Sequence, residues 1–398
     1  MSDSQIPMFP FHSADPVSAP PEYAKLREQA PVSQVRLPSG DLAWLITRYE
    51  DVRMVMADPR FSREAITAPG APRVLPIARG SKSIFVMDPP DHTRLRRLVG
   101  RAFAPRQISL LRPRIDELAN ELVKAMAAGQ PPADLIAALA QPLPINVICE
   151  MLGVPYQDVP KFKAWTDLML SFDQSNAEAV AEARDKLSDY LRALIADKQR
   201  QPTDDLLMVL VNATEDGDRL TEEELLAFGY TLLGAGYHAT TAEIVHALIV
   251  LLRDPQEWQR LRAEPNLLPL AVDELLRRSQ AGGGLGALRI AVEDVQVGPV
   301  LIRAGDAVLP SMHAANRDPS VFAEAERLDL ARQPNPHVSF GYGIHHCLGA
   351  QLGRIELEIV LAALLRHTPN LRLAVPESEL EWNRFVAFRR PRELPVTW

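Results

Sequence analysis

The stretch VSFGYGIHHCLGAQLGR, from Val338 to Arg354, holds one of only two cysteines in a chain of 398 residues. Gly341 and Gly343 precede Cys347, and glycine lets the backbone take positive φ values and approach a bound group closely. The residues after Cys347 place apolar side chains at helical spacing. Cys347 is therefore predicted at the N-terminal end of a helix, where the dipole and the free N–H groups stabilise a thiolate.

Three interpretations of Cys347 follow from these residues. It is a buried structural cysteine, a nucleophile or a metal-ligating thiolate. A nucleophile needs a base, and only His345 and His346 lie nearby in the sequence.

The segment FGYGIHHCLG resembles the haem-binding loop of the cytochrome P450 family, F-G-x-G-x-(His or Arg)-x-C-x-G, at every fixed position. This resemblance implies that the Cys347 thiolate ligates the iron of haem b, with Phe340 and His345 in the same cofactor site. Such a thiolate pushes electron density to the iron and favours O–O cleavage.

The composition narrows the class of protein. A formal net charge of -8 argues against a nucleic-acid binder, because phosphate contacts need a basic face. Two cysteines make no disulfide framework, and no signal peptide is evident at the N-terminus, so we expect a cytoplasmic protein. The most apolar long stretch contains His238, Glu243 and His246, which are costly in lipid, so it predicts a buried helix and no membrane span.

The pattern of elements is mainly helical with a small β part. Residues 42–49 read as a strand, and residues 107–128 as a helix ended by Gly129. Thr221 and Glu224 have capping-box spacing and open a helix of about 32 residues, ~48 Å long, before Asp254-Pro255. No linker or repeat interrupts the chain, so residues 1–398 are predicted to form one domain. The resemblance implies the cytochrome P450 fold, with this long central helix over the haem.

A second motif of the family lies in DELLRR, where Glu274 and Arg277 are three residues apart on one helix face. A solvated surface pair is the plain interpretation of these two residues alone. The resemblance implies a structural triad completed by a later arginine, for which Arg327 is predicted.

A third motif, DPPDHTRLRRLVGRAFAP, places His92 and Arg96 on one face of a helix. Taken alone, the segment is an ordinary basic helix. The resemblance implies that both residues, together with Arg289 and His345, hold the haem propionates.

The opposite stripe of that helix carries Arg94, Arg97 and Arg101, and it is predicted to stay solvated and to dock an acidic electron donor. The resemblance implies a ferredoxin and a ferredoxin reductase as partners.

The sequence departs from the family at GAGYHATTA in the long helix, where the family has A-G-x-(Asp or Glu)-Thr. Counted from Ala235-Gly236, the acid position is His238 and the alcohol position is Ala239. Counted back from Thr240, the acid position is Ala239. Neither register offers a carboxylate, so His238, Thr240, water or substrate groups are the candidates for supplying protons.

This departure resembles an actinobacterial branch that oxidises cyclodipeptides, in some members by aromatic C–C or C–N coupling. We therefore expect oxidation of a cyclodipeptide. The alternative is hydroxylation of a polyketide or terpenoid; further alternatives are a haem sensor or carrier without turnover, and a hydrolase using Cys347. The predicted catalytic residues are Thr240 and His238, and the predicted substrate contacts are Phe85, Val86, His238, Thr240 and Phe388.

Overall fold

The computed structural model describes residues 6–74, 83–169, 177–203, 205–215, 217–282, 287–383 and 388–398. Its contacts group into two compact units, each assembled from segments far apart in the sequence. The first unit comprises Met1–Asp91 and Pro269–Ala350, and the second comprises His92–Leu268 and Gln351–Trp398. That residues 1–398 form a single domain stays a prediction.

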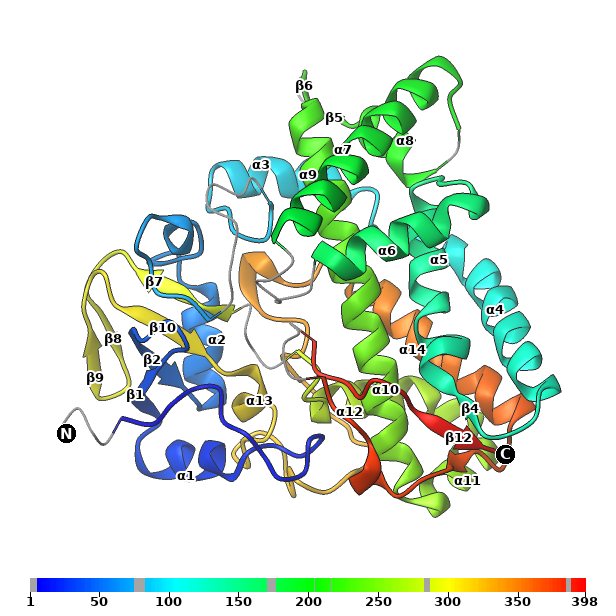
Figure 1. Ribbon diagram of the computed structural model, residues 1–398. Coiled ribbons are helices and arrows are strands. Elements are labelled where there is room, and N and C mark those ends of the chain that lie inside the picture. The colour runs from blue at the N-terminus through cyan, green and yellow to red at the C-terminus, as the bar shows by residue number, and fades with distance from the viewer. Residues whose placement is uncertain are drawn as a thin grey trace. The chain divides into compact units, whose positions relative to one another are not determined.

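The first unit is built on a five-stranded mixed sheet in the order β1-β2-β10-β7-β3. Strand β10 runs parallel to β2, and the other pairs are antiparallel. Valine, leucine and isoleucine side chains of the sheet are buried in two apolar clusters, which fix the strands against the short helices of this unit. Figure 1 shows the early blue strands beside the later yellow ones. The strands are β1 (Val32–Arg36), β2 (Leu42–Ile46), β3 (Phe61–Ser62), β7 (Arg289–Ala291) and β10 (Ala307–Pro310).

Short helices and a hairpin complete the first unit. The predicted strand at 42–49 is confirmed as β2, and the helix after it begins at Tyr49. The remaining elements are α1 (Pro21–Gln29), α2 (Tyr49–Ala57), α12 (Leu268–Arg278), the hairpin of β8 (Val295–Val297) and β9 (Val300–Ile302), and α13 (Met312–Ala315).

The second unit is mainly helical, with two small sheets (Figure 1). Helix α4 ends where Gly129 was predicted to stop it. The helices are α3 (Asp91–Gly100), α4 (Pro105–Ala128), α5 (Pro142–Met151), α6 (Val159–Met169), α7 (Ala177–Arg200), α8 (Leu206–Val211), α9 (Glu222–Leu232), α10 (Ala239–Leu252), α11 (Pro255–Ala263) and α14 (Ala350–His367). The strands are β4 (Ala133–Asp134), β5 (Thr214–Glu215), β6 (Asp218–Arg219), β11 (Arg372–Leu373) and β12 (Pro395–Thr397).

The predicted long helix is present as one continuous element of 31 residues, Glu222–Leu252. The Thr221 hydroxyl accepts from the Glu224 N–H, and the Glu224 carboxylate accepts from the Thr221 N–H, which confirms the capping box. Within the described residues this is the one helix long and apolar enough to cross a membrane, and 56% of its apolar window is buried inside the protein. Such burial is typical of a core helix.

A π-helical segment, Leu233–His238, joins α9 to α10 within this helix. A π turn wraps one more residue than an α turn. The two registers in which GAGYHATTA can be aligned diverge at His238, the last residue of the π segment. A side chain at Gly236 would put a Cβ 2.6 Å from Ile148 Cδ1 of α5, so the Ile148 side chain packs directly against the glycine and would have to shift for a larger residue.

Candidate functional site

The loop before α14 presents Cys347 at an exposed position. Gly341 and Gly343 have φ values of +77° and +73°, as their place in the motif predicted. A Cβ at Gly343 would lie 2.7 Å from the Met56 backbone oxygen, so only glycine fits against α2. The Cys347 N–H donates to the Phe340 carbonyl at 2.8 Å, which closes the loop two residues before the helix region.

Cys149, the other cysteine, is fully buried in α5. Burial raises the pKa of its thiol to about 12, so it does not supply a thiolate at neutral pH. Cys347 is the cysteine that fits a metal-ligating role.

A buried ion cluster supports the Cys347 loop in the first unit. Arg277 Nε and Nη2 each donate to the Glu274 carboxylate at 2.7 Å, and both side chains are fully buried. The third member is Arg332, whose Nε donates to Glu274 at 3.0 Å. The prediction of Arg327 was wrong: that side chain is exposed and pairs with Glu324 in the preceding turn, whereas Arg332 enters the buried cluster.

Two residues that sequence reasoning missed connect this cluster to the loop. Arg277 Nη1 donates to the Asn316 carbonyl at 2.6 Å. The Asn316 side chain donates to Ser339 Oγ at 2.8 Å and accepts from the Val338 N–H at 2.8 Å. Val338 begins the glycine-rich loop, so a fully buried ion pair fixes the start of the segment that carries Cys347.

The predicted propionate contacts are divided between the two units. In the first unit, Arg289 is buried on β7 and His345 ends the 3₁₀ turn Gly343–His345. In the second unit, His92 is buried and Arg96 is partly buried, one turn later on α3. The guanidinium of Arg289 donates to the backbone carbonyls of Ala287 and Met56, and burial lowers its pKa to about 10.

The arginine stripe of α3 differs from the prediction. Helix α3 ends at Gly100, so Arg101 lies in the turn after it. Arg94 is not a solvated cation, because it is held by the carboxylates of Asp218 and Glu224. Assigning residues to the faces of α3 could not reveal this ion pairing, since the two acids come from the β5–β6 hairpin and the start of α9. Arg97 and Arg101 are exposed, as predicted.

His238 lies at the end of the π segment, in contact with a residue of α6. Its Nε2 is 3.4 Å from Asp167 Oδ1, and its ring lies against that of Tyr237 in a tilted arrangement, with centroids 4.2 Å apart and planes inclined by 51°. Burial lowers the pKa of His238 to about 4, and the nearby Asp167 charge opposes that shift only in part. The imidazole is therefore neutral at pH 7, and its contact with Asp167 is not a full ion pair.

Asp167 and Arg390 complete this polar cluster, and sequence reasoning missed both. Asp167 accepts from Lys163 Nζ at 2.7 Å, one turn earlier on α6, and both side chains are partly exposed. The Arg390 charge acts on both Tyr237 and His238, and burial lowers the pKa of Arg390. The C-terminal loop that holds Arg390 is tied to α10 by the His246 side chain, whose Nε2 contacts the Arg389 carbonyl at 2.7 Å.

The other predicted site residues have distinct surroundings. Thr240 is half-buried at the start of α10, whereas the Thr241 hydroxyl donates to the Tyr237 carbonyl at 2.9 Å. Phe85 is 49% exposed, and Val86 is buried in an apolar cluster of the first unit. Phe388 is half-buried in the C-terminal loop of the second unit.

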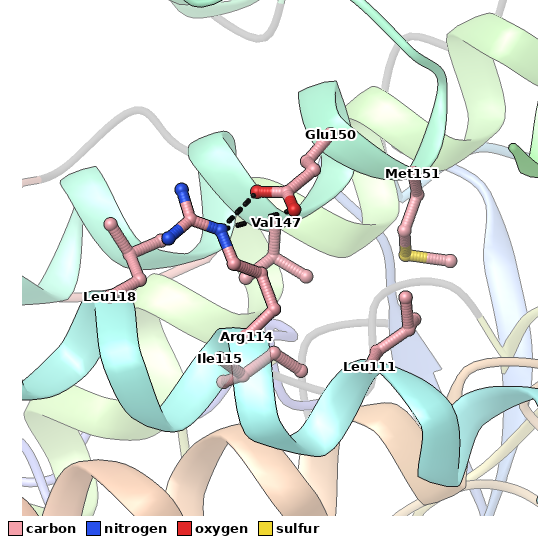
Figure 2. A pocket seen from close by; sticks show the side chains of 7 residues that line it. All are labelled: Leu111, Arg114, Ile115, Leu118, Val147, Glu150 and Met151. Atoms are coloured by element: carbon pink, nitrogen blue, oxygen red, sulfur yellow. Dashed lines mark hydrogen bonds and ion pairs between the residues drawn. The ribbon is translucent and has the colours of Figure 1, made fainter.

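A small cavity between α4 and α5 is shown in Figure 2. It has room for about 20 Å³, roughly one water molecule. The Arg114–Glu150 ion pair covers one side of it, and the other labelled residues are apolar. It offers no group for chemistry and is a packing gap between the two helices.

Comparison with known proteins identifies relatives of this chain. The family profile described as Cytochrome P450 matches residues 145–385. The Mycinamicin IV hydroxylase/epoxidase of Micromonospora griseorubida is 45% identical over 399 residues and aligns over 100% of both chains.

The chain belongs to the cytochrome P450 family.

Other relatives support both the family and the fold. The Nocardicin C N-oxygenase of Nocardia uniformis subsp. tsuyamanensis is 45% identical to this P450, also over 100% of both chains. A mutant of the mixed-function P450 MycG in complex with mycinamicin IV has a TM-score of 0.94 at 45% identity, covering 99% of this chain and 100% of that one. The P450 fold predicted from the sequence is thereby confirmed.

P450 enzymes are monooxygenases that hold haem through a cysteine thiolate. The residues of this P450 fit that cofactor. Cys347 is exposed on a loop that glycines shape, and Arg289 is a buried cation bonded, among the described residues, to backbone carbonyls rather than to a carboxylate. Haem needs a thiolate ligand for its iron and cationic side chains for its propionate carboxylates. Cys347 and the buried Arg289 can meet these two needs.

Proposed function

We propose that this protein is a hydroxylating monooxygenase of secondary metabolism that uses Cys347 as the ligand of haem iron. The observation that carries the proposal is the exposed Cys347 loop, fixed by the buried Glu274–Arg277–Arg332 cluster. The activities for which the two relatives are named, hydroxylation or epoxidation and N-oxygenation, both insert oxygen into a substrate.

When bound, the haem supplies the activation of dioxygen. Hydroxylation inserts one oxygen atom of dioxygen into a C–H bond to give C–OH. The second oxygen atom leaves as water, and its reduction consumes two electrons and two protons. We expect His92, Arg96, Arg289 and His345 to hold the propionates, as their motif positions predict. Each charge-assisted contact contributes roughly 1.5–3 kcal/mol, so Arg96→Ala should lose haem faster than the wild type.

The residues around the π segment are suited to deliver the protons. The carboxylate that GAGYHATTA lacks has a counterpart in Asp167 of α6, whose Oδ1 is 3.4 Å from His238 Nε2. The Asp167 side chain is partly exposed and its buried Oδ1 faces His238 Nε2, while the neutral His238 imidazole can accept a proton on one nitrogen and release one from the other. Thr240, two residues further along the helix, offers a hydroxyl for the last transfer.

The cluster also yields a test of this proton route. Asp167→Asn keeps the size of the side chain but removes its charge. We expect this variant to consume electrons and dioxygen with less hydroxylated product, and its coupling efficiency to depend on pH differently from the wild type. Lys163→Gln, which removes the neighbouring cation but leaves the carboxylate, serves as the control. An unchanged coupling efficiency and pH profile in Asp167→Asn would rule the route out.

Hydroxylation is better supported than the cyclodipeptide oxidation that GAGYHATTA predicted. Neither of these two relatives is named for an aromatic coupling. We propose a polyketide or a comparably large product as substrate, with Phe85, Val86, His238, Thr240 and Phe388 as its contacts. The electron donors are proposed to be a ferredoxin and its reductase, which dock through Arg97 and Arg101. A cytoplasmic location stays a prediction.

The proposal is tested by product analysis under ¹⁸O₂. The holoenzyme is supplied with spinach ferredoxin, its reductase and NADPH, and with one substrate at a time: mycinamicin IV, nocardicin C or a tryptophan-containing cyclodipeptide. Hydroxylation adds one labelled oxygen atom to a product, whereas coupling adds none. Labelled product from mycinamicin IV or nocardicin C supports the proposal. Turnover of the cyclodipeptide alone, into a coupled product without label, would overturn it.

A further inference from the structure

Arg63 is a buried arginine in the first unit that no motif singled out. It follows β3 at the edge of the sheet, and β3 pairs with β7, which carries Arg289. Its relative exposure is only 4%, and that of Arg289 is 1%. The two guanidinium charges repel each other, and burial together with this repulsion lowers the pKa of Arg63 to about 9. Both side chains remain cationic at pH 7.

The guanidinium of Arg63 has unused hydrogen-bond donors. Among the residues that the structure describes, its Nε and Nη2 have no hydrogen-bond partner and no contact with solvent. One face of the group lies 4.1 Å from the Phe85 ring centroid. A buried guanidinium with unmade hydrogen bonds costs several kcal/mol of stability, so a native protein places one there for a partner.

The nearby carboxylate does not supply that partner. Asp88 accepts hydrogen bonds from the Ser62 hydroxyl and from the backbone N–H groups of Arg63 and Glu64, at 3.0 and 3.3 Å for the two N–H groups. Its oxygens are thus used by the backbone and by serine. Two guanidinium groups and one carboxylate leave one uncompensated positive charge in a buried place, which a single anionic group would neutralise.

The geometry specifies the anion. Nε and Nη2 lie along the same edge of the planar guanidinium, and a carboxylate matches that edge with two parallel N–H···O bonds. The Phe85 ring covers the face of the guanidinium and favours an occupant whose body is apolar.

We propose that Arg63 binds a carboxylate side-on through Nε and Nη2, with Arg289 as the second cation and Phe85 as an apolar cover. Two molecules could carry this carboxylate: the haem, through a propionate, or the substrate. The haem source rests on the proposed function. The substrate source would place an acidic product among the substrates of the enzyme.

One experiment distinguishes the two sources. Holoenzyme is prepared with haem or with haem dimethyl ester, whose propionates are esterified, and the loss of the cofactor to excess apomyoglobin is timed. If a propionate is the occupant, wild type should lose the ester at least about tenfold faster than haem. Arg63→Gln should lose haem about tenfold faster than wild type and show a smaller difference between ester and haem, because the other propionate contacts remain. Arg60→Gln, three residues away and exposed, is the matched control and should behave like the wild type.

The substrate source is tested with 3-phenylpropionate and its methyl ester, titrated calorimetrically against the same proteins. If a substrate carboxylate is the occupant, wild type should prefer the acid by about tenfold or more and Arg63→Gln should not. Arg63→Lys keeps the positive charge but lacks the two parallel N–H donors of the guanidinium, so it should lose most of either effect. This second variant keeps the test decisive if Arg63→Gln folds poorly. The proposal would be overturned if the Arg63 variants stayed within twofold of wild type both in the rate of cofactor loss and in the preference for the acid over its methyl ester. A wild type that takes up no haem would overturn the proposed function instead, and the calorimetric arm would still decide this inference.

Discussion

Glu356 is a carboxylic acid buried inside α14. Its side chain is fully buried, Oε1 has no hydrogen-bond partner among the described residues, and burial alone raises its pKa to about 8. Glu356→Gln replaces the acid by a neutral group of the same shape. We predict that this variant is more stable than the wild type and that its advantage grows with pH.

The sign and size follow from proton linkage. The unfolded chain releases the Glu356 proton near pH 4.5, whereas the folded protein keeps it until about pH 8. The folded state therefore binds more protons in this window, and its stability falls by about 1.4 kcal/mol for each pH unit. This cost reaches about 3 kcal/mol at pH 7 and levels off at about 5 kcal/mol above pH 8. Between pH 5.5 and 7.5 the advantage of Glu356→Gln should grow by about 2.7 kcal/mol.

Urea unfolding of the holoenzyme at pH 5.5, 7.5 and 8.5, followed by tryptophan fluorescence and haem absorbance, measures the effect. Other titrating groups cancel in the difference between variant and wild type. The control is Glu358→Gln on the same helix, which loses only a surface pair with Arg112 and should cost at most about 1 kcal/mol at every pH. A pH-independent difference between Glu356→Gln and the wild type would refute the reasoning.

Three further predictions concern the site and its surface. Arg332→Ala should destabilise the protein by about 3–5 kcal/mol because it leaves the buried Glu274 charge under-compensated, while Arg327→Ala should change stability by at most about 0.5 kcal/mol. Equal urea unfolding midpoints for the two variants would contradict the role of Arg332 in the buried cluster. Ala239→Asp should weaken substrate binding in spectral titrations without improving coupling, because it adds a half-buried carboxylate; better coupling would count against the Asp167 route. Replacing Arg97 and Arg101 by glutamine should slow reduction by ferredoxin at low salt and less so near physiological ionic strength, where exposed charges are screened within about 8 Å; equal low-salt rates would exclude docking there.

The parts of the fold that depend on local rules could be predicted from the sequence. The capping box at Thr221, the end of α4 at Gly129 and the positive φ values of Gly341 and Gly343 each follow from one residue type and its neighbours. The haem loop could be recognised for the same reason, since its pattern is contiguous.

The errors arose where the outcome depends on residues distant in sequence. Arg327 and Arg332 both follow Glu274 by more than fifty residues, and only the fold decides which of them reaches it. Arg94 is neutralised by Asp218 of a hairpin and Glu224 of α9, both more than 120 residues later in the sequence. Asp167 could not be linked to His238, because nothing in the sequence of α6 shows which face it turns to the long helix.

The reduced carbon monoxide spectrum tests the central claim, thiolate ligation by Cys347, most directly. The wild type and Cys149→Ala, the matched control at the only other cysteine, should both show the long-wavelength Soret band typical of thiolate-bound haem. Cys347→Ala should lose this band even where haem is retained. An unchanged band in Cys347→Ala, or its loss in Cys149→Ala alone, would contradict the account.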